Sequence, residues 1–505
     1  MNTLQMNWVK LLSAKTKNSY TKTDKKNPNN APCMQSSPEI SFYERDVERV
    51  LFSNAFKRLQ NKTQVVPLSD NDYIHNRYTH SLEVAAIGFD IGKRVGILIW
   101  DQKLTPDEKE QIQKFFNPND KQVKDEISKE TTRIKFSYAL ANIVKTGCLI
   151  HDIGNPPFGH QGEAAITEVL ENYRNKNDKF KALTGKKLDL VKVEGNAQTL
   201  RLILLNTNID LTTASIVSSF KYLRASTKPD TIYKKFGYYE SEEQEFNDLI
   251  KHTTGEQKCT TNINSLARHP LTYLVEASDD IAYTLFDFED FVRAGFIDFA
   301  TLEDLFNQLT STKQDKEILN NAKELGAKLS QLRSKAINAL RNHVISTFID
   351  KYTLIMTGNY TQDQDNALLS SKGTICGLLH IDGKNDMTKN GSPSSPNIPN
   401  IPKIISAIEE KSRKYGYNHK KVLKHGLAGY NIMKYLTETF LDAYYNSELT
   451  HSKMLRGMFP KVFTDEYNEY KNIRNIIDEL TGMTDRYALQ IYQILNGFNL
   501  QHIEI

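Results

Sequence analysis

Apolar residues recur at spacings of three and four along most of this chain, and this periodicity constrains its fold more than any other feature. It runs through residues 42–59, 80–99, 136–150, 162–173, 195–205, 264–288 and 335–356. Such spacing is typical of helices with one buried face, whereas half-buried strands alternate apolar and polar residues. Alternation is scarce, with short strand candidates only at 233–239 and 374–380. The sequence therefore predicts a mainly α fold.

Composition limits the classes of protein to consider. The 505 residues are 39% hydrophobic and 25% charged, a profile typical of a soluble globular protein. The net charge of +4 is small, so any polyanion would have to bind at local basic clusters. The four cysteines form no CxxC pair, which argues against a thiolate zinc site and favours a reducing cytoplasm. We expect no export signal and no membrane span or membrane partner.

Polar stretches suggest where the chain divides. Residues 15–38 are mostly Lys, Asn, Thr, Ser and Pro, so we expect a flexible N-terminal arm over residues 1–40. A helical core is expected over 41–300, followed by a C-terminal helical region over 301–505. Within that region the Ser, Asn, Pro and Gly-rich residues 383–402 indicate a long loop.

The dipeptide His151-Asp152 follows an apolar helix and precedes Gly154, Pro156 and Pro157, which prevent that helix from continuing. Alone, such a dipeptide fits a solvated turn. Two further candidate ligands, His80 and Asp279, lie on helices with an apolar face. Two imidazoles and two carboxylates suit an octahedral Mn, Mg, Fe, Co or Ni ion with positions left open for water and a phosphate oxygen. Open positions would indicate catalysis.

Several sequence blocks resemble those of the bacterial deoxyguanosine triphosphate triphosphohydrolases, a family of the HD superfamily. They are RYTHSLEV from residue 77, HDIGNPPFGHQGE from 151, EGNAQTLR from 194 and SDDIAY from 278. RLQNKTQV from residue 58 and GMTDRYAL from 482 extend the resemblance in the family's order. It implies an HD-domain helical bundle with additional C-terminal helices, in which residues 41–300 form the metal-dependent phosphohydrolase core.

The resemblance also implies a reaction and a metal site. Its metal ligands would be His80, His151, Asp152 and Asp279, holding Mn, Mg or another first-row divalent ion. The family hydrolyses the bond between the α-phosphorus and the 5′ oxygen, releasing a deoxynucleoside and inorganic triphosphate. His160 and Glu163 would be the acid/base pair, with His160 as the expected proton donor and Glu163 as its partner or the group that aligns water. Glu163 could instead simply favour a helix N-terminus.

The resemblance assigns the substrate contacts as well. Gln64 and Asp287 would lie near the deoxyribose 3′-hydroxyl and Tyr283 against the sugar face, and Asp279, Tyr283 and Asp287 share a helical face at spacings of four. The predicted triphosphate contacts are Arg77, Asn196 and Lys221. Without the resemblance, Tyr283 fits core packing and Lys221 fits a solvated surface. Asn155 stands where some relatives carry His, which favours the dGTP-preferring branch.

The leading interpretation is thus a cytoplasmic enzyme that hydrolyses dGTP, with other dNTPs as alternative substrates. Two further readings stay open: an HD phosphohydrolase acting on another guanine nucleotide or second messenger, and a module that senses nucleotides or single-stranded DNA. The resemblance implies a homo-oligomer, a tetramer or hexamer with contacts through residues 301–505, and regulation by a dNTP or single-stranded DNA.

Overall fold

The computed structural model describes most of the chain. The described ranges are residues 6–16, 41–65, 73–118, 126–176, 180, 189–205, 209–227, 235–255, 266–309, 325–360, 400–464 and 468–498. Within them the regular secondary structure is helical, with three isolated bridges and no strand. This confirms the predicted mainly α fold. None of the described helices combines the length and apolar character needed to cross a bilayer.

The helices vary from single turns to seven turns. In chain order they are α1 (Trp8–Leu11), α3 (Phe42–Phe52), α4 (Asn54–Lys57), η1 (Arg58–Asn61), α5 (Arg77–Gln102), α6 (Pro106–Phe116), α7 (Glu126–Ile150), α8 (His160–Lys176), α10 (Gly195–Leu205), α11 (Thr213–Val217), η3 (Glu240–Glu242), α12 (Glu243–Lys251), α13 (Pro270–Arg293), α14 (Phe299–Leu309), α16 (Leu325–Asp350), α17 (Tyr352–Met356), α18 (Ile401–Lys411), the π-helix η6 (Ser412–Tyr417), α19 (Lys420–Tyr445), α20 (Thr450–Met458), α21 (Glu469–Gly482) and α22 (Asp485–Leu495).

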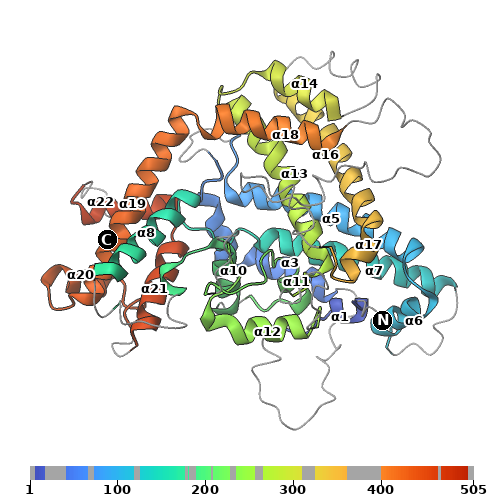
Figure 1. Ribbon diagram of the computed structural model, residues 1–505, viewed down its shortest axis with the longest axis horizontal. Coiled ribbons are helices and arrows are strands. Elements are labelled where there is room, and N and C mark those ends of the chain that lie inside the picture. The colour runs from blue at the N-terminus through green and yellow to red at the C-terminus, as the bar shows by residue number, and fades with distance from the viewer. Residues whose placement is uncertain are drawn as a thin grey trace, which may run out of the picture.

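Helices α5, α7 and α13 form the centre of the molecule, and each contacts the other two (Figure 1). Glycines on α5 let it approach α7 closely. A Cβ added at Gly92 would lie 3.0 Å from the Cα of Ala141, and one at Gly96 would lie 2.7 Å from the Cα of Ser137. Helices α5 and α13 carry His80 and Asp279, and His151 follows the last residue of α7, so the close packing of these helices sets the distances between the candidate ligands.

Two apolar cores support this centre. The larger core takes in α1, α3, α5, α7, α13, α14, α16 and α18, and the smaller joins α8 to α19 through α22. Figure 1 shows α8 alongside α19, although more than 240 residues separate them in the chain. The cores therefore divide the chain differently from the predicted boundary at residue 300. Residues 151–160 lead from the larger core, which contains Ile153, to the smaller, which contains Phe158.

The N-terminal segment differs from the expected flexible arm over its described part. Met6, Trp8 and Leu11 are buried in the larger core, and the Trp8 indole donates a hydrogen bond to the hydroxyl oxygen of Tyr352 (2.8 Å). Apolar burial anchors this turn because it removes several large side chains from water. Residues 17–40 lie outside the described residues.

Other local predictions are corrected in detail. The described part of the strand candidate at 233–239 forms only a bridge between Ala225 and Tyr238, and the candidate at 374–380 lies outside the described residues. Residues 383–399 of the predicted loop lie outside the described residues, and its last three begin α18 instead: Asn400 caps this helix and Pro402 occupies its first turn, where proline needs no hydrogen-bond partner. The helix predicted over 335–356 breaks between α16 and α17 at Lys351.

Candidate active site

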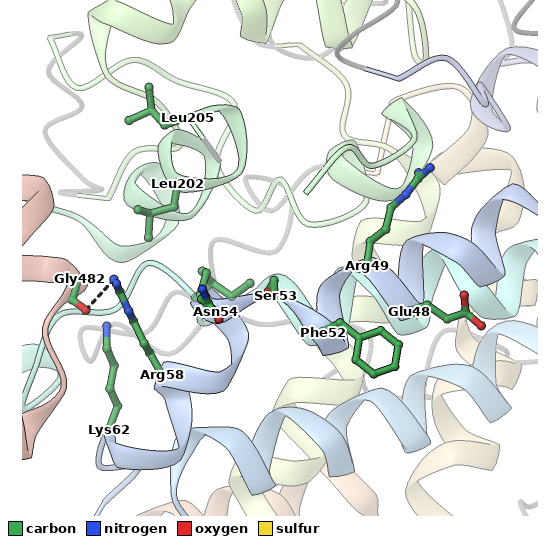
Figure 2. A pocket seen from close by; sticks show the side chains of 12 residues that line it. Glu48, Arg49, Phe52, Ser53, Asn54, Arg58, Lys62, Leu202, Leu205 and Gly482 are labelled. Atoms are coloured by element: carbon green, nitrogen blue, oxygen red, sulfur yellow. Dashed lines mark hydrogen bonds between the residues drawn. The ribbon is translucent and has the colours of Figure 1, made fainter. Parts of the chain in front are cut away.

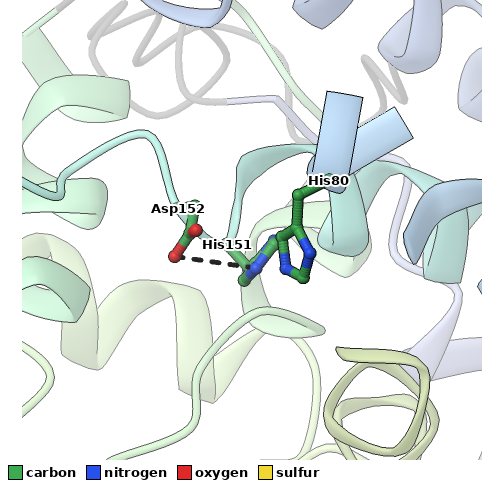
Figure 3. A group of neighbouring side chains, drawn as sticks. All are labelled: His80, His151 and Asp152. Atoms are coloured by element: carbon green, nitrogen blue, oxygen red, sulfur yellow. Dashed lines mark ion pairs between the residues drawn. The ribbon is translucent and has the colours of Figure 1, made fainter. Parts of the chain in front are cut away.

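His151 and Asp152 lie directly beyond the end of α7, as the sequence predicts. The Nδ1 of His151 lies 2.6 Å from the carbonyl oxygen of Cys148 on the last turn of the helix. This contact makes Nδ1 the protonated nitrogen and leaves the Nε2 lone pair available, the arrangement found for metal-binding histidines. His151 Nε2 lies 3.6 Å from Asp152 Oδ1 (Figure 3).

His80 reaches the same point from the first turn of α5. Asn76 caps this helix, with its side chain accepting from the Thr79 amide and the Thr79 hydroxyl accepting from the Asn76 amide. One ligand atom each from His80, His151 and Asp152 lies within 4.8 Å of the other two, which places the three groups around one point (Figure 3).

Asp279, from the middle of α13, completes the predicted set. Its Oδ1 lies 3.1 Å from His80 Nε2 and 3.4 Å from His151 Nε2. Asp279 therefore reaches both imidazoles, while His80, His151 and Asp152 are the three groups whose ligand atoms all lie within 4.8 Å of one another. Two imidazole nitrogens and two carboxylates form a donor set that fits a first-row divalent ion.

The charges within this cluster favour a bound cation. Burial disfavours a charged imidazole at His151, but Asp152 and Asp279 outweigh it and raise the pKa of His151 to about 9. Although burial opposes ionisation of Asp152, Arg77 and His151 lower its pKa to about 2. Burial likewise opposes ionisation of Asp279, and the two histidines hold its pKa well below its usual range. Both carboxylates are thus ionised, and a divalent ion would take the place of the proton on His151.

Asp152 is held by two neighbours. Arg77 Nη1 donates to Asp152 Oδ2 (2.5 Å), and the Asn155 amide donates to Asp152 Oδ1 (2.5 Å). Arg77, predicted to contact phosphate, thus pairs with a candidate metal ligand in this structure, while its buried Nε has no partner among the described residues. These bonds orient the carboxylate and leave part of the guanidinium for an additional acceptor.

The loop after Asp152 lies against the start of α10 at two glycines. A Cβ on Gly154 would lie 2.2 Å from the Thr199 amide nitrogen, and one on Gly195 would lie 2.2 Å from the Asn155 side-chain oxygen. At Gly154 the contacts are with backbone atoms and exclude a side chain, whereas a Cβ at Gly195 would require the Asn155 side chain to move. The backbone approach brings the EGNAQTLR block beside the HD dipeptide.

His160 and Glu163 open α8. His160 was expected in the preceding loop but is the first residue of the helix, and it is exposed. Glu163 faces the Gly195 amide (3.2 Å) and Lys235 (3.7 Å) instead of His160. Its side chain therefore belongs to a cluster that joins α8 to α10.

The two groups differ in their affinity for protons. Burial, followed by the like charge of Glu194, raises the pKa of Glu163 to about 7. Although part of His160 is exposed, the protein around its ring desolvates it, and this effect, followed by the cations Lys235 and Arg77, lowers the pKa of His160 to about 4. Without substrate, Glu163 therefore holds a proton more readily than His160, whereas a bound triphosphate would raise both pKa values.

Asn196 and Lys221, predicted to contact phosphate, line one small cavity of about 10 Å³ together with His151. Lys221 Nζ lies 3.8 Å from a Glu276 carboxylate oxygen. Burial opposes the charge on Lys221, but Tyr222 and Glu276 outweigh it and raise its pKa above the usual range. A permanent cation thus lies beside the candidate metal ligands.

The predicted sugar contacts lie further along α13. Asp287 is buried, with Oδ2 accepting from the Tyr417 hydroxyl (2.6 Å) and Oδ1 without a partner among the described residues. The ring of Tyr283 stacks on that of Tyr417, with centroids 5.9 Å apart. Gln64 also has a buried side-chain oxygen for which the described residues offer no partner. Unpaired buried acceptors of this kind are suited to a ligand hydroxyl.

Sequence reasoning missed Lys235 and Tyr417. Lys235 pairs with Glu194 (3.0 Å) and Glu163, and Tyr417 links Tyr283 to Asp287. In the chain, 130 residues separate Tyr417 from Asp287. No local pattern marks either contact.

A larger cavity of about 670 Å³ lies beside Ile153, in the loop that follows Asp152 (Figure 2). Its lining includes Phe52, Arg58, Lys62, Ile153 and Leu202 but none of the four candidate ligands. Arg58 Nη1 donates to the Gly482 carbonyl across one edge of this cavity (3.3 Å).

Comparisons with known proteins agree with this geometry. Residues 77–210, which contain His80, His151 and Asp152, match the family model described as "HD domain". A deoxyguanosinetriphosphate triphosphohydrolase-like protein of a Synechocystis species is 28% identical, over 92% of this chain and 95% of its own length. A protein with the same description from Listeria innocua is 28% identical over 98% of this chain and its own full length.

A relative from Yersinia pestis named deoxyguanosinetriphosphate triphosphohydrolase is 26% identical, over 90% of this chain and 93% of its own. The similarity therefore extends well beyond the HD domain and includes the C-terminal helices. Residues 77–210 are thus similar to HD domains, and nearly the whole chain is similar to proteins named deoxyguanosinetriphosphate triphosphohydrolase or described as like it.

Proposed function

We propose that this chain is a metal-dependent deoxynucleoside triphosphate triphosphohydrolase with dGTP as its leading substrate. The observation that carries the proposal is the grouping of His80, His151 and Asp152, with Asp279 against both imidazoles, near the side chains of Asn196 and Lys221. A phosphohydrolase needs this combination of a site for a divalent cation and adjacent groups that bind phosphate. The names of the relatives supply the substrate.

The metal would be held by the two imidazole nitrogens and the two carboxylates. When bound, a divalent ion supplies charge neutralisation and lowers the pKa of water. Arg77 and Asn155 keep the Asp152 carboxylate oriented, and the Cys148 carbonyl keeps His151 in the tautomer that exposes Nε2. The protein thus fixes its ligands before any ion arrives.

Phosphate and sugar contacts would be divided between two sides of the ligand cluster. Asn196, Lys221 and Lys235 offer a donor and two cations toward a triphosphate. Tyr283 and Tyr417 present a stacked aromatic surface, and Asp287 with Gln64 offers unpaired acceptors for the 3′-hydroxyl. An aromatic ring beside the sugar would exclude a ribose 2′-hydroxyl by steric contact.

Hydrolysis at the α-phosphorus requires a proton for the departing 5′ oxygen and a base for the attacking water. His160 and Glu163 at the start of α8 are the groups we assign to these roles. A bound triphosphate would raise the pKa of His160 and so equip it to donate. Glu163, whose pKa is already about 7, is poised to exchange a proton near neutral pH.

The test is product analysis with purified protein, Mn or Mg, each of the four dNTPs, and GTP. Deoxynucleoside together with intact triphosphate, released fastest from dGTP, supports the proposal. Turnover of cyclic or hyperphosphorylated guanine nucleotides in place of dNTPs would favour the second-messenger reading. No turnover with any nucleotide, even with single-stranded DNA added, would favour a sensing module. Homo-oligomer formation and regulation by a dNTP or single-stranded DNA remain predictions for the same preparation.

The metal assignment has a separate test. Asp152→Ala should abolish metal binding, measured by calorimetry, and turnover together. A variant that keeps both would refute the assignment of the ligands.

A further inference from the structure

The loop of residues 153–159, which follows Asp152, and the segment that contains Gln64 both contact one buried carboxylate, that of Asp485. It lies at the start of α22 and is 1% exposed. Its Oδ1 accepts a hydrogen bond from the Phe158 amide (2.9 Å), and its Oδ2 accepts from the Thr63 amide (2.9 Å) and the Thr63 hydroxyl (2.5 Å). The Phe158 and Thr63 backbones are 95 residues apart in the chain, and neither contact is local to α22.

Both partners adjoin residues of the proposed site. Phe158 lies two positions before His160 and three after Asn155, and Thr63 directly precedes Gln64. Displacement of either backbone would therefore move a group assigned to the reaction. Hydrogen bonds to an ionised carboxylate are about twice as strong as those between neutral groups, so one residue can hold both segments.

The loop needs such a restraint because its backbone is unusual. Phe158 has a φ of 59°, the single left-handed φ of a non-glycine residue among those described, and Gly159 follows with 57°. A non-glycine residue is strained in this region and persists there only where its surroundings fix it. The Phe158 ring packs against Gly429 of α19, where a Cβ would lie 2.4 Å from the ring. Asp485 fixes the other end of this residue, at its amide.

A second set of hydrogen bonds connects the same two segments to the end of α21. The buried amine of Lys62 donates to the Asn155 carbonyl (2.5 Å) and to the Thr481 carbonyl (2.8 Å). Arg58 adds its bond to the Gly482 carbonyl, visible with Lys62 in Figure 2. The turn from residue 481 to 485 is thereby attached to both site segments at several points.

We infer that Asp485 is a positioning residue, whose carboxylate fixes the loop that leads to His160 against the segment that carries Gln64. This inference rests on the proposed function for its kinetic consequences. The placement of the two segments can be measured without any catalysis.

The variant Asp485→Asn tests whether the carboxylate holds the two segments or is merely a buried polar group. Asparagine keeps the shape but replaces one carboxylate oxygen with a donor. Because both oxygens face donors, one contact must open whichever way the amide turns. The matched control is Asp46→Asn. Asp46 is equally buried and accepts from the Thr212 amide and hydroxyl, but it joins α3 to the start of α11, away from the ligand cluster.

The experiment compares hydrogen exchange, metal affinity and kinetics for wild type, Asp485→Asn and Asp46→Asn. We expect the backbone amides of Phe158, Gly159 and His160 to exchange faster in Asp485→Asn than in Asp46→Asn when the two variants are equally stable overall. We also expect kcat to fall by about 10- to 100-fold, the loss expected from a shift of about 1 Å, with metal affinity unchanged. The control should keep kcat within about twofold of wild type.

The inference would be overturned if Asp485→Asn showed the same hydrogen exchange in this loop and the same kcat as the control Asp46→Asn. If wild type shows no triphosphohydrolase activity, the proposed function fails, and the exchange comparison still decides the role of Asp485. Should Asp485→Asn not fold, Thr63→Val removes a single hydroxyl. It should raise KM several-fold while kcat changes little, and an unchanged KM with unchanged exchange would equally overturn the inference.

Discussion

Gly195→Ala is a small change that should disturb the metal site without touching a ligand. The added Cβ would lie 2.2 Å from the Asn155 side-chain oxygen, which is 0.8 Å inside the 3.0 Å limit that real Cβ contacts observe. Asn155 must therefore rotate or shift by nearly 1 Å. Because its amide donates to Asp152 Oδ1, the shift breaks one of the bonds that orient this candidate ligand.

Two contributions set the expected losses of stability and of metal affinity. Overpacking at a rigid contact costs about 1–3 kcal/mol of unfolding free energy. Loss of a hydrogen bond to a charged carboxylate costs about 1.5–3 kcal/mol, which weakens metal binding by roughly 10- to 100-fold if the loss falls on the metal-bound state. The assays are chemical denaturation for stability and calorimetric titration with Mn for affinity.

Two comparisons sharpen this test. Gly326→Ala, where a Cβ would meet nothing within 4 Å, should leave both quantities near wild type. Combining Gly195→Ala with Asn155→Ala removes the colliding atom, so the double variant should be as stable as Asn155→Ala alone. A Gly195→Ala protein with wild-type stability and wild-type metal affinity would refute the close approach of the loop to α10.

Three further outcomes follow from the site. Glu163 has a folded-state pKa of about 7, above its ordinary value of 4.5, so its contribution to stability falls as pH rises from about 4.5 to 7. Glu163→Gln should therefore gain stability relative to wild type across that range and keep the gain at higher pH. Chemical denaturation at several pH values would detect this difference. Tyr417→Phe removes the hydroxyl bonded to Asp287 and should raise the KM for dGTP by about 10-fold with a smaller change in kcat, and an unaltered KM would remove Tyr417 from the sugar site. Chelation of divalent ions should lower the melting temperature of wild type and leave that of Asp152→Ala unchanged, since only a folded-state ligand stabilises by binding.

The sequence predicts those parts of the site that depend on local order. His151 and Asp152 share one helix end, and a strong apolar helix followed by glycine and prolines reveals that end directly. Asp279, Tyr283 and Asp287 follow helical spacing along α13. The resemblance to a family joined these local features into one site.

Contacts between distant segments were not predictable in the same way. Tyr417 reaches Asp287 over 130 residues, and Asp485 reaches Phe158 over 327. Arg77 pairs with Asp152 in the structure, although its position in a phosphate-binding block suggested a different partner. Such pairings depend on how the two apolar cores pack, and periodicity within one segment carries no information about that packing.

The most direct test of the central claim is the fate of oxygen in a single reaction. The protein, Mn and dGTP would be incubated in water labelled with ¹⁸O, with the nucleoside analysed by mass spectrometry and the phosphate products by ³¹P NMR. Attack of water at the α-phosphorus predicts deoxyguanosine without label and intact triphosphate with one ¹⁸O on a terminal phosphorus. Label in monophosphate, with dGDP as the other product, would contradict the account, because it would place the attack at the γ-phosphorus.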